Sequence, residues 1–311
     1  MAIFRMGLVG AGRMGRTHLR ALAGSDLLRV VAIADPLESA RAAVEAPGIS
    51  VHADVASMLR ASGLDGVLIA SSSDTHLAGI TELAAAGIPI LCEKPCGLSS
   101  RQGQEAAAFA AAAKVPLQVA YWRRFVPSLK KLKTRITAGE LGDLYLAVCY
   151  QWDEQPPPAS FRNRSGGIFM DMAVHEFDQI RWLSGQEIGE IHALAARTLS
   201  APPVPGDAES AQVLCALSGG ATGLISLGRR FPLGDVCKAE VFGTKGAEEC
   251  RFLWPPAAER AFLEALRLQA ESFVRWVGGA PAEGASALDA VAALEAAERA
   301  SRIFQNAGEK R

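Results

Sequence analysis

The first 122 residues alternate between short apolar runs and helix-like segments. The apolar runs consist mainly of Val, Ile, Leu and Ala, a composition typical of strands buried on both faces of a parallel sheet. The predicted strands cover residues 6–12, 28–35, 66–73, 88–94 and 116–122, with a short extended piece at 51–54. The predicted helices cover residues 13–24, 39–46, 55–62, 75–87 and 100–114. Because crossovers between parallel strands are right-handed, the alternation predicts an α/β fold with a doubly wound parallel sheet.

The pattern changes after residue 121, and 311 residues are enough for two domains. Longer strands with Gly-rich turns predict a second, α+β domain with a mainly antiparallel sheet. We therefore predict one domain over residues 1–121 and another over 122–311, with the last helix packing back on the first domain. The loop 154–167 holds three prolines and is expected to lack regular structure. The predicted strands are 144–153, 191–199, 210–230 and 238–252, and the predicted helices are 128–142, 168–184, 257–278 and 286–306.

Charge and cysteine content exclude several classes of protein. The formal net charge is −1, which gives no reason to expect nucleic acid or an anionic membrane as the main partner. No run reaches the ~18 apolar residues of a membrane span. The six cysteines match neither a zinc site nor a disulfide framework, so we expect reduced thiols in a cytoplasmic protein.

Residues 10–15 read GAGRMG, a GxGxxG loop between the first strand and the first helix. Gly10 allows the tight turn, Gly12 lets the backbone approach a pyrophosphate, and Gly15 lets the helix pack closely against the strand. Asp35 ends the second strand, where it can bind the adenosine ribose hydroxyls and repel a 2′-phosphate. The motif predicts NAD binding, with NADP disfavoured, and the alternative is a tight turn without a ligand. The expected cofactor contacts in this region are Gly10, Gly12, Arg13, Met14, Gly15 and Asp35.

Small polar residues follow the strand predicted at 66–73. Ser71, Ser72 and His76 lie at its carboxyl end, and such positions face the cofactor crevice of a doubly wound sheet. We expect these three residues to contact the cofactor. The alternative is that this segment only caps the following helix, through Ser73 or Asp74.

Lys94 follows the apolar run that ends at Cys92, between Glu93 and Pro95. A surface loop would explain a lone lysine, but it would need neither a preceding strand nor a proline that fixes the turn. An ammonium group at this edge can bind a substrate hydroxyl and stabilise developing negative charge. We therefore predict that Lys94 acts in catalysis, with Glu93 and Lys94 both near the cofactor.

The segment 168–184 is predicted as a helix with a polar face. With 3.6 residues per turn, Asp171, His175 and Asp178 fall in one sector, at spacings of four and three. A carboxylate beside an imidazole fixes its tautomer and raises its basicity, which suits a general base for an alcohol. An exposed polar face with an ordinary ion pair is the alternative. Zinc binding is disfavoured because no third or fourth ligand is evident, so no metal is expected.

Three motifs together resemble the Gfo/Idh/MocA oxidoreductase family. They are the opening GAGRMGRTHLRAL, the CEKP turn at Lys94, and the stretch GGIFMDMAVHEFD. The resemblance covers nearly the whole chain and is weakest after residue 200. Within the family, the order and spacing of RRFVPSLKKLKTRITAGELG and PPP…RSGGIFMDMAVHEFDQIRWL are most similar to bacterial myo-inositol 2-dehydrogenases.

The resemblance implies a Rossmann domain followed by a domain whose open sheet makes a homodimer or homotetramer contact. It implies that Lys94, Asp171 and His175 match the catalytic trio, and that the Lys94-Pro95 peptide is cis. It also implies that Arg124 lines the active site.

Some positions depart from the family pattern. Trp152 stands at a strand end that is often polar, and residues 233–236 read LGDV where inositol dehydrogenases carry a tyrosine-containing stretch. We expect Trp152 to line the substrate site, together with Lys94, Arg124, Asp171 and His175. More apolar surface and fewer hydroxyl partners favour a substrate other than myo-inositol, such as another cyclitol, a sugar or a less hydroxylated ring.

The function that fits these features is an NAD-dependent oxidoreductase that oxidises a secondary hydroxyl of a cyclitol or sugar to a ketone. His175, held by Asp171, would take the hydroxyl proton, and Lys94 would polarise the oxygen. One alternative is an enzyme of the same fold, either a sugar or sugar-nucleotide ketoreductase or a redox glycosidase. The other is a non-catalytic dinucleotide-binding regulator, which would have no use for the trio.

Overall fold

The computed structural model describes residues 2–196 and 207–309. The chain folds into two compact units, each built from two separate stretches of sequence. Unit 1 comprises Met1–Phe125 and Leu263–Val291, and unit 2 comprises Val126–Phe262 and Ala292–Arg311. The boundary predicted between residues 121 and 122, and the packing predicted for the last helix, stay predictions.

Unit 1 contains a seven-stranded sheet with the order β13-β6-β5-β4-β1-β2-β3. All neighbours are parallel except β13, which pairs antiparallel with β6. Strand order reverses between β1 and β4, and a ligand crevice is expected at the carboxyl ends of strands at such a point. The predicted doubly wound sheet is confirmed. The strands are β1 (Phe4–Val9), β2 (Leu28–Ala34), β3 (Ser50–His52), β4 (Gly66–Ile69), β5 (Ile90–Cys92), β6 (Leu117–Val119) and β13 (Ala285–Ser286).

The helices of unit 1 follow the predicted order but differ in their bounds. Helices α3 and α5 each begin at a side-chain cap, with Asp54 accepting from Ser57 N at 2.7 Å and Ser99 from Gln102 N at 3.3 Å. The strand predicted to reach residue 73 ends at Ile69, because a 3₁₀ turn, η1, begins at Ser73. The elements are α1 (Arg13–Leu22), α2 (Glu38–Ala42), α3 (Val55–Ser62), η1 (Ser73–Thr75), α4 (His76–Ala85), α5 (Ser100–Ala112), η2 (Trp122–Phe125) and, from Leu263 onward, α9 (Ala258–Val277).

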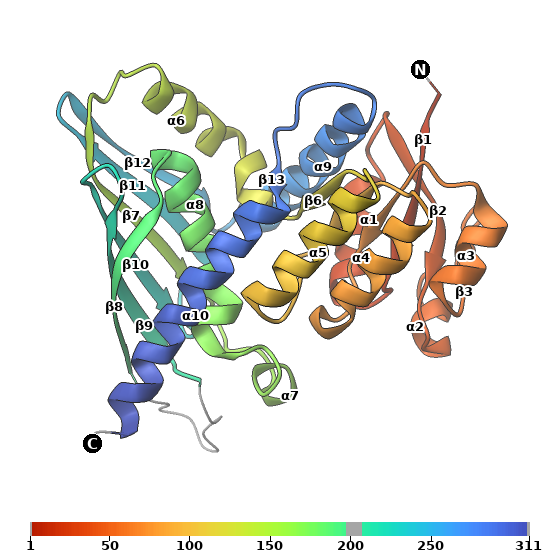
Figure 1. Cartoon of the computed structure of the whole chain (residues 1–311), viewed down its shortest axis with the longest axis horizontal. Helices are drawn as coiled ribbons and strands as arrows, with labels where there is room; N and C mark the ends of the chain where they lie inside the picture. The colour runs from red at the N-terminus through yellow and green to blue at the C-terminus, as the bar shows by residue number, and fades with distance from the viewer. Residues whose placement is uncertain (1, 197–206, 310–311) are drawn as a thin grey trace. The chain divides into compact units, whose positions relative to one another are not determined.

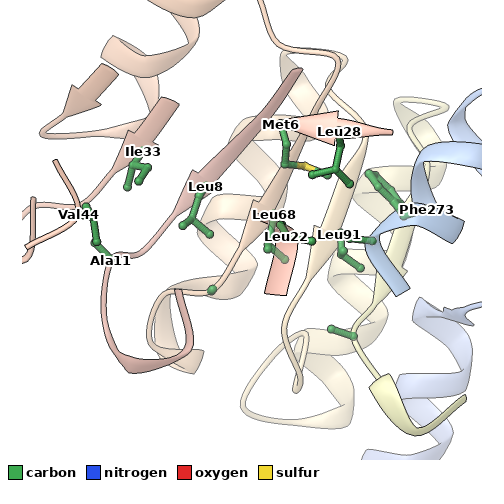
Figure 2. Packing of buried hydrophobic residues seen from close by; sticks show 13 residues of the cluster. Met6, Leu8, Ala11, Leu22, Leu28, Ile33, Val44, Leu68, Leu91 and Phe273 are labelled. Atoms are coloured by element: carbon green, nitrogen blue, oxygen red, sulfur yellow. The ribbon is translucent and has the colours of Figure 1, made fainter. Parts of the chain in front are cut away.

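The core of unit 1 joins residues that are far apart in the sequence. Leu8, Leu68 and Leu91 come from three adjacent strands and belong to one buried cluster with Phe273 of α9 (Figure 2). The Phe273 ring packs edge-on against Phe4, with ring centroids 6.3 Å apart. Burial on both faces explains why these strands are apolar without a polar alternation.

Unit 2 contains a six-stranded sheet with the order β12-β11-β7-β10-β9-β8. Its pairs are antiparallel except β10 with β7, so the prediction of a mainly antiparallel sheet is confirmed. Helices α6 and α8 pack on one face, and no described helix or strand covers the other (Figure 1). The strands are β7 (Leu144–Trp152), β8 (Ile188–Ala196), β9 (Ser210–Leu217), β10 (Thr222–Gly228), β11 (Val236–Gly243) and β12 (Gly246–Leu253).

Two helical segments of unit 2 differ from prediction. The proline-rich loop contains a short helix, α7, whose residues follow Pro158, so the expectation of no regular structure over 154–167 is wrong there. The segment predicted as one helix over 168–184 begins with a π-helical turn, η3, before α8, which ends at Gly185 with φ 70°. The predicted end of strand 191–199 lies partly outside the described residues. The helices are α6 (Pro127–Thr137), α7 (Ala159–Arg162), η3 (Phe169–Ala173), α8 (Val174–Ser184) and, from Ala292 onward, α10 (Ala287–Glu309).

Candidate functional site

The glycine loop lies between β1 and α1, and each glycine meets a different constraint. Gly10 has φ 98°, and a Cβ there would lie 2.5 Å from Ser71 N. A Cβ on Gly15 would collide with the carbonyl oxygen of Gly10. A Cβ on Gly12 would meet no protein atom within 4 Å, so the space beside it is open to a ligand. Arg13 and Met14 open α1 directly after this loop. The loop thus fits a pyrophosphate that approaches the backbone at the helix N-terminus.

Asp35 follows β2, and its carboxylate is fixed by the backbone. Its Oδ2 accepts a hydrogen bond from Ala11 N at 2.8 Å, and its Oδ1 accepts one from Leu37 N at 2.9 Å. An ionised carboxylate can accept about four hydrogen bonds, so capacity remains for ribose hydroxyls. Gly10, Ala11 and Asp35 are therefore held together at the carboxyl edge of the sheet in unit 1.

The residues after β4 divide into exposed and buried ones. Ser72 is exposed, and the hydroxyl of Ser71 lies 2.7 Å from that of Thr75. His76 is only 1% exposed, with Nδ1 2.7 Å from Pro95 O and Nε2 3.1 Å from Ser71 O. The His76 ring is thus placed to support the turn after β5. The cofactor contacts predicted for Ser71, Ser72 and His76 stay predictions.

Lys94 stands in a turn that follows β5, and the Lys94-Pro95 peptide is cis. Glu93 is buried, and its Oε1 lies 2.6 Å from Nε2 of His18 on α1. Burial would raise the pKa of Glu93, but the hydrogen bond from His18 and the electrostatic effects of His18 and Lys94 outweigh it, so this pKa lies below its ordinary value. The sequence prediction missed His18, although a histidine on the buried face of α1 was visible in the motif RTHLRAL.

Arg124 is buried in unit 1, in the 3₁₀ turn η2. Its guanidinium pairs with Asp289 at the start of α10, with Nη2 3.4 Å from Oδ1. Its predicted contact with substrate stays a prediction.

Asp171 and His175 lie in unit 2, on either side of the junction between η3 and α8. A π turn is wider than an α turn, so the predicted angular position of Asp171, which assumed one α-helix, is incorrect. Asp178 is 1% exposed, so the predicted polar sector is not a solvent-exposed face. Because π-helical turns are frequent at functional sites, this irregular turn favours a role for Asp171.

A buried arginine, Arg229, holds Asp171. Arg229 follows β10, is 0% exposed, and donates from Nη1 to Asp171 Oδ2 at 3.2 Å. Its Nη2 donates to Asp207 Oδ1 at 3.3 Å, and Asp207 also accepts from Arg162 Nε at 2.5 Å. Sequence reasoning missed this network, because Arg229 was read as the end of a strand.

Trp152 ends β7 in the same unit, and Asp153 directly follows it. The Trp152 indole donates to Ser226 Oγ at 3.2 Å, and Gly228 lacks the side chain that would collide with its ring. Burial raises the pKa of Asp153 to about 6; the hydrogen bond from Gln151 opposes the rise, and the Asp171 and Asp235 carboxylates add to it. A carboxyl group with this pKa changes protonation near neutral pH, which is typical of functional sites.

Lys94 belongs to unit 1, whereas Asp171 and His175 belong to unit 2. The assembly of the predicted trio therefore stays a prediction. Across residues 2–196 and 207–309, no group of three or more His, Cys, Asp or Glu side chains is arranged to hold a metal ion. Among the residues described, no helix combines the length and apolar character needed to cross a bilayer.

Comparison with family models matches both parts of the chain. The model described as "Oxidoreductase family, NAD-binding Rossmann fold" matches residues 4–121. The model described as "GFO/IDH/MocA C-terminal domain" matches residues 129–248.

Similar curated proteins and solved structures cover almost the whole chain. Rhizopine catabolism protein MocA of Rhizobium meliloti is 52% identical over 98% of this chain and 96% of its own. Inositol 2-dehydrogenase of Rhizobium meliloti is 32% identical over 96% of each chain. A putative myo-inositol dehydrogenase structure from Sinorhizobium meliloti has a TM-score of 0.90 and 31% identity, covering 99% of this chain and 98% of that one. A scyllo-inositol dehydrogenase from Lactobacillus casei, solved with NAD(H) and scyllo-inositol, has a TM-score of 0.85 and 26% identity, covering 98% and 97%.

Proposed function

The chain belongs to the GFO/IDH/MocA oxidoreductase family, and on that premise we propose that it is an NAD-dependent dehydrogenase of a cyclitol or sugar. It oxidises a secondary hydroxyl to a ketone. The observation that carries this proposal is the placement of Lys94 just after the carboxyl end of β5, two strands from β1, whose carboxyl end leads into the dinucleotide loop. A regulator that only binds the dinucleotide would have no use for an ammonium group there.

Each residue of the proposed site has a chemical task. The glycine loop and Asp35 hold the dinucleotide, whose nicotinamide accepts a hydride when bound. His175 removes the hydroxyl proton, and Asp171 keeps the imidazole oriented. Lys94 donates a hydrogen bond to the same oxygen and stabilises the charge that develops on it. In the reverse direction, His175 begins protonated and returns the proton.

Arg229 supports this assignment from within unit 2. Its buried guanidinium contacts Asp171 and fixes one carboxylate oxygen. A buried charge that lost its partner would cost several kcal/mol, so the ion pair with Arg229 holds the Asp171 carboxylate in place. We assign Arg229 as a residue that positions Asp171.

The proposed substrate class rests on the relatives and on Trp152. Relatives are named as inositol 2-dehydrogenases, and the 52% identical relative is named for rhizopine catabolism. The large indole at the end of β7 supports a ring with fewer hydroxyl groups than myo-inositol on one side. We therefore propose a cyclitol or sugar other than myo-inositol, with rhizopine as a candidate.

The test is NADH formation, followed by absorbance at alkaline pH. Purified protein is mixed with NAD or NADP and with a panel of inositols, aldoses, sugar acids and rhizopine. NADH formation with one ring polyol, and much less NADPH, is the expected result. A preference for myo-inositol over every other compound would overturn the substrate proposal. Silence across the panel, together with demonstrated NAD binding, would favour a ketoreductase or a non-catalytic binder instead.

The open face of the sheet in unit 2 supports a homo-oligomer, a homodimer or homotetramer. Residues in register on this face include Val148, Leu214 and Leu224 at its centre, and Leu214 is 48% exposed. Lys238 and Glu240 place charges of both signs beside them. A face with both signs of charge around apolar residues can pair with a second copy of itself. The six free, buried cysteines support a reducing compartment, which we take to be the cytoplasm.

A further inference from the structure

A buried histidine–glutamate contact links the helix of the glycine loop to the turn that carries Lys94. His18 lies on α1, is 0% exposed, and places Nε2 2.6 Å from Oε1 of Glu93. Its Nδ1 has no hydrogen-bond partner among the described residues. The ring is therefore held through Nε2, the nitrogen that faces the Glu93 carboxylate.

The second oxygen of Glu93 reaches the backbone of Lys94. Glu93 Oε2 accepts a hydrogen bond from Lys94 N at 3.2 Å. One carboxylate thus bonds α1 through one oxygen and the backbone of Lys94 through the other. A displacement of α1 would be transmitted to Lys94 through two hydrogen bonds.

The opposite side of the turn is held by a second histidine. His76 of α4 places Nδ1 2.7 Å from Pro95 O and Nε2 3.1 Å from Ser71 O. Ser71 follows β4 and contacts the hydroxyl of Thr75 at the start of α4. The turn is therefore fixed by two sets of contacts, those of Glu93 and those of His76. The contact through Glu93 connects the turn to α1, the dinucleotide helix.

We propose that His18 and Glu93 are positioning residues that couple the dinucleotide helix to the backbone of Lys94. NAD that settles on the N-terminus of α1 then also restrains the residue that polarises the substrate oxygen. The proposal rests on the proposed function for what Lys94 does, but the mechanical coupling itself can be measured without any substrate. A purely structural role for the pair would lower the stability of unit 1 without a specific effect at Lys94.

The test is hydrogen–deuterium exchange of the peptide that spans residues 91–98, with and without NAD. The variant His18→Leu removes the donor, and His18→Gln keeps a donor at a similar reach. The matched control is Leu22→Ala, which removes a buried side chain from the same helix without touching Glu93. The free energy of unfolding and the NAD affinity are measured for each variant, so that its exchange rate can be compared with its loss of stability.

A hydrogen bond to a charged group is stronger than one between neutral groups, so we expect exchange at Lys94 to speed up at least about tenfold in His18→Leu. In His18→Gln the rate should return to near that of the natural chain. NAD should slow this exchange in the natural chain and in Leu22→Ala, but no longer in His18→Leu, although His18→Leu still binds NAD. Once a substrate is known, turnover should fall in His18→Leu while NAD affinity stays nearly constant.

The proposal is overturned if Leu22→Ala speeds the exchange as much as His18→Leu at equal loss of stability. It is also overturned if NAD slows the exchange at Lys94 equally in Leu22→Ala and His18→Leu. Should His18→Leu fail to fold, Glu93→Gln gives the same information, because its amide has one acceptor oxygen and cannot serve both His18 and Lys94. Unchanged exchange in Glu93→Gln would contradict the coupling. A substrate panel without activity would defeat the proposed function but leave the exchange result intact.

Discussion

At the residue scale, charged side chains that directly follow apolar strands recur in both units. Asp35 follows β2 and Lys94 comes shortly after β5, whereas Asp153 and Arg229 follow β7 and β10. The sequence predicted the first two because a glycine loop and a proline turn accompany them. It missed Arg229, because the carboxylates that Arg229 contacts lie far away in the chain. It also missed Asp153, because the burial that raises its pKa comes from the folded structure. Arg229 is 58 residues from Asp171, and no local pattern reveals such a pairing.

Removal of the Lys94 ammonium should separate turnover from cofactor binding. We expect Lys94→Ala to lower kcat by about 10²- to 10³-fold, because the loss of one positioned donor to a developing oxyanion has that size. The NAD dissociation constant should stay within about threefold, as the glycine loop and Asp35 are untouched. Steady-state kinetics and fluorescence titration give the two values. Arg101→Ala, on the exposed face of α5, is the matched control, and equal losses of binding and turnover in Lys94→Ala would make Lys94 a cofactor residue.

Asp153 should make the protein less stable as pH rises. Its pKa is about 6 in the folded chain against 3.8 as the ordinary value. As pH rises, Asp153 therefore ionises in the unfolded chain before it ionises in the folded one. The resulting loss of folding stability is absent below pH 3.8, grows between pH 3.8 and pH 6, and is complete above pH 6. At 1.36 kcal/mol per pKa unit, Asp153→Asn should stabilise the fold by up to about 3 kcal/mol at pH 8. Urea denaturation at pH 4 and pH 8 measures this, and an equal effect at both values would contradict it.

At the element scale, regular segments were predictable and their irregular ends were not. Strand β4 is apolar throughout, and β1 and β2 are apolar except for Arg5 and Arg29 near their starts, because helices cover both faces of the sheet. Strands β3 and β13 have three and two residues and exist because a neighbour pairs with them. The π turn at Phe169–Ala173 escaped prediction because periodicity analysis assumes one constant rotation per residue.

The glycine loop allows a matched pair of substitutions with opposite effects. In Gly12→Val the new side chain would point into open space, and the φ of residue 12 is −70°, which valine can adopt. The free energy of unfolding should therefore change by no more than about 0.5 kcal/mol. NAD affinity should nevertheless fall by at least about tenfold, because the side chain occupies the ligand's space. Gly15→Ala collides with the Gly10 carbonyl and should destabilise the protein itself. Calorimetric titration and thermal unfolding distinguish the two, and similar melting losses in both variants would refute the assignment.

At the scale of the whole molecule, we expect copies of the chain to associate through the open sheet of unit 2. Leu214→Glu should convert the oligomer to monomers, because a buried carboxylate without a partner would have to form at each contact. Sedimentation velocity gives the mass directly. Leu37→Glu, at a 64% exposed site in unit 1, is the control and should leave the oligomer unchanged. An oligomer that survives Leu214→Glu would place the contact elsewhere.

Unit 1 is built from two stretches of chain separated by more than a hundred residues. Strand β13 completes the edge of its sheet, and Ala270 and Phe273 of α9 complete its core. During synthesis on the ribosome, the first 125 residues emerge long before these partners do. Until then the growing chain carries an unpaired strand edge and uncovered apolar surface, which are the features that chaperones bind and that lead to aggregation. The nucleotide-binding unit is therefore begun first, but it cannot be completed until residues 263–291 have been made, after most of unit 2.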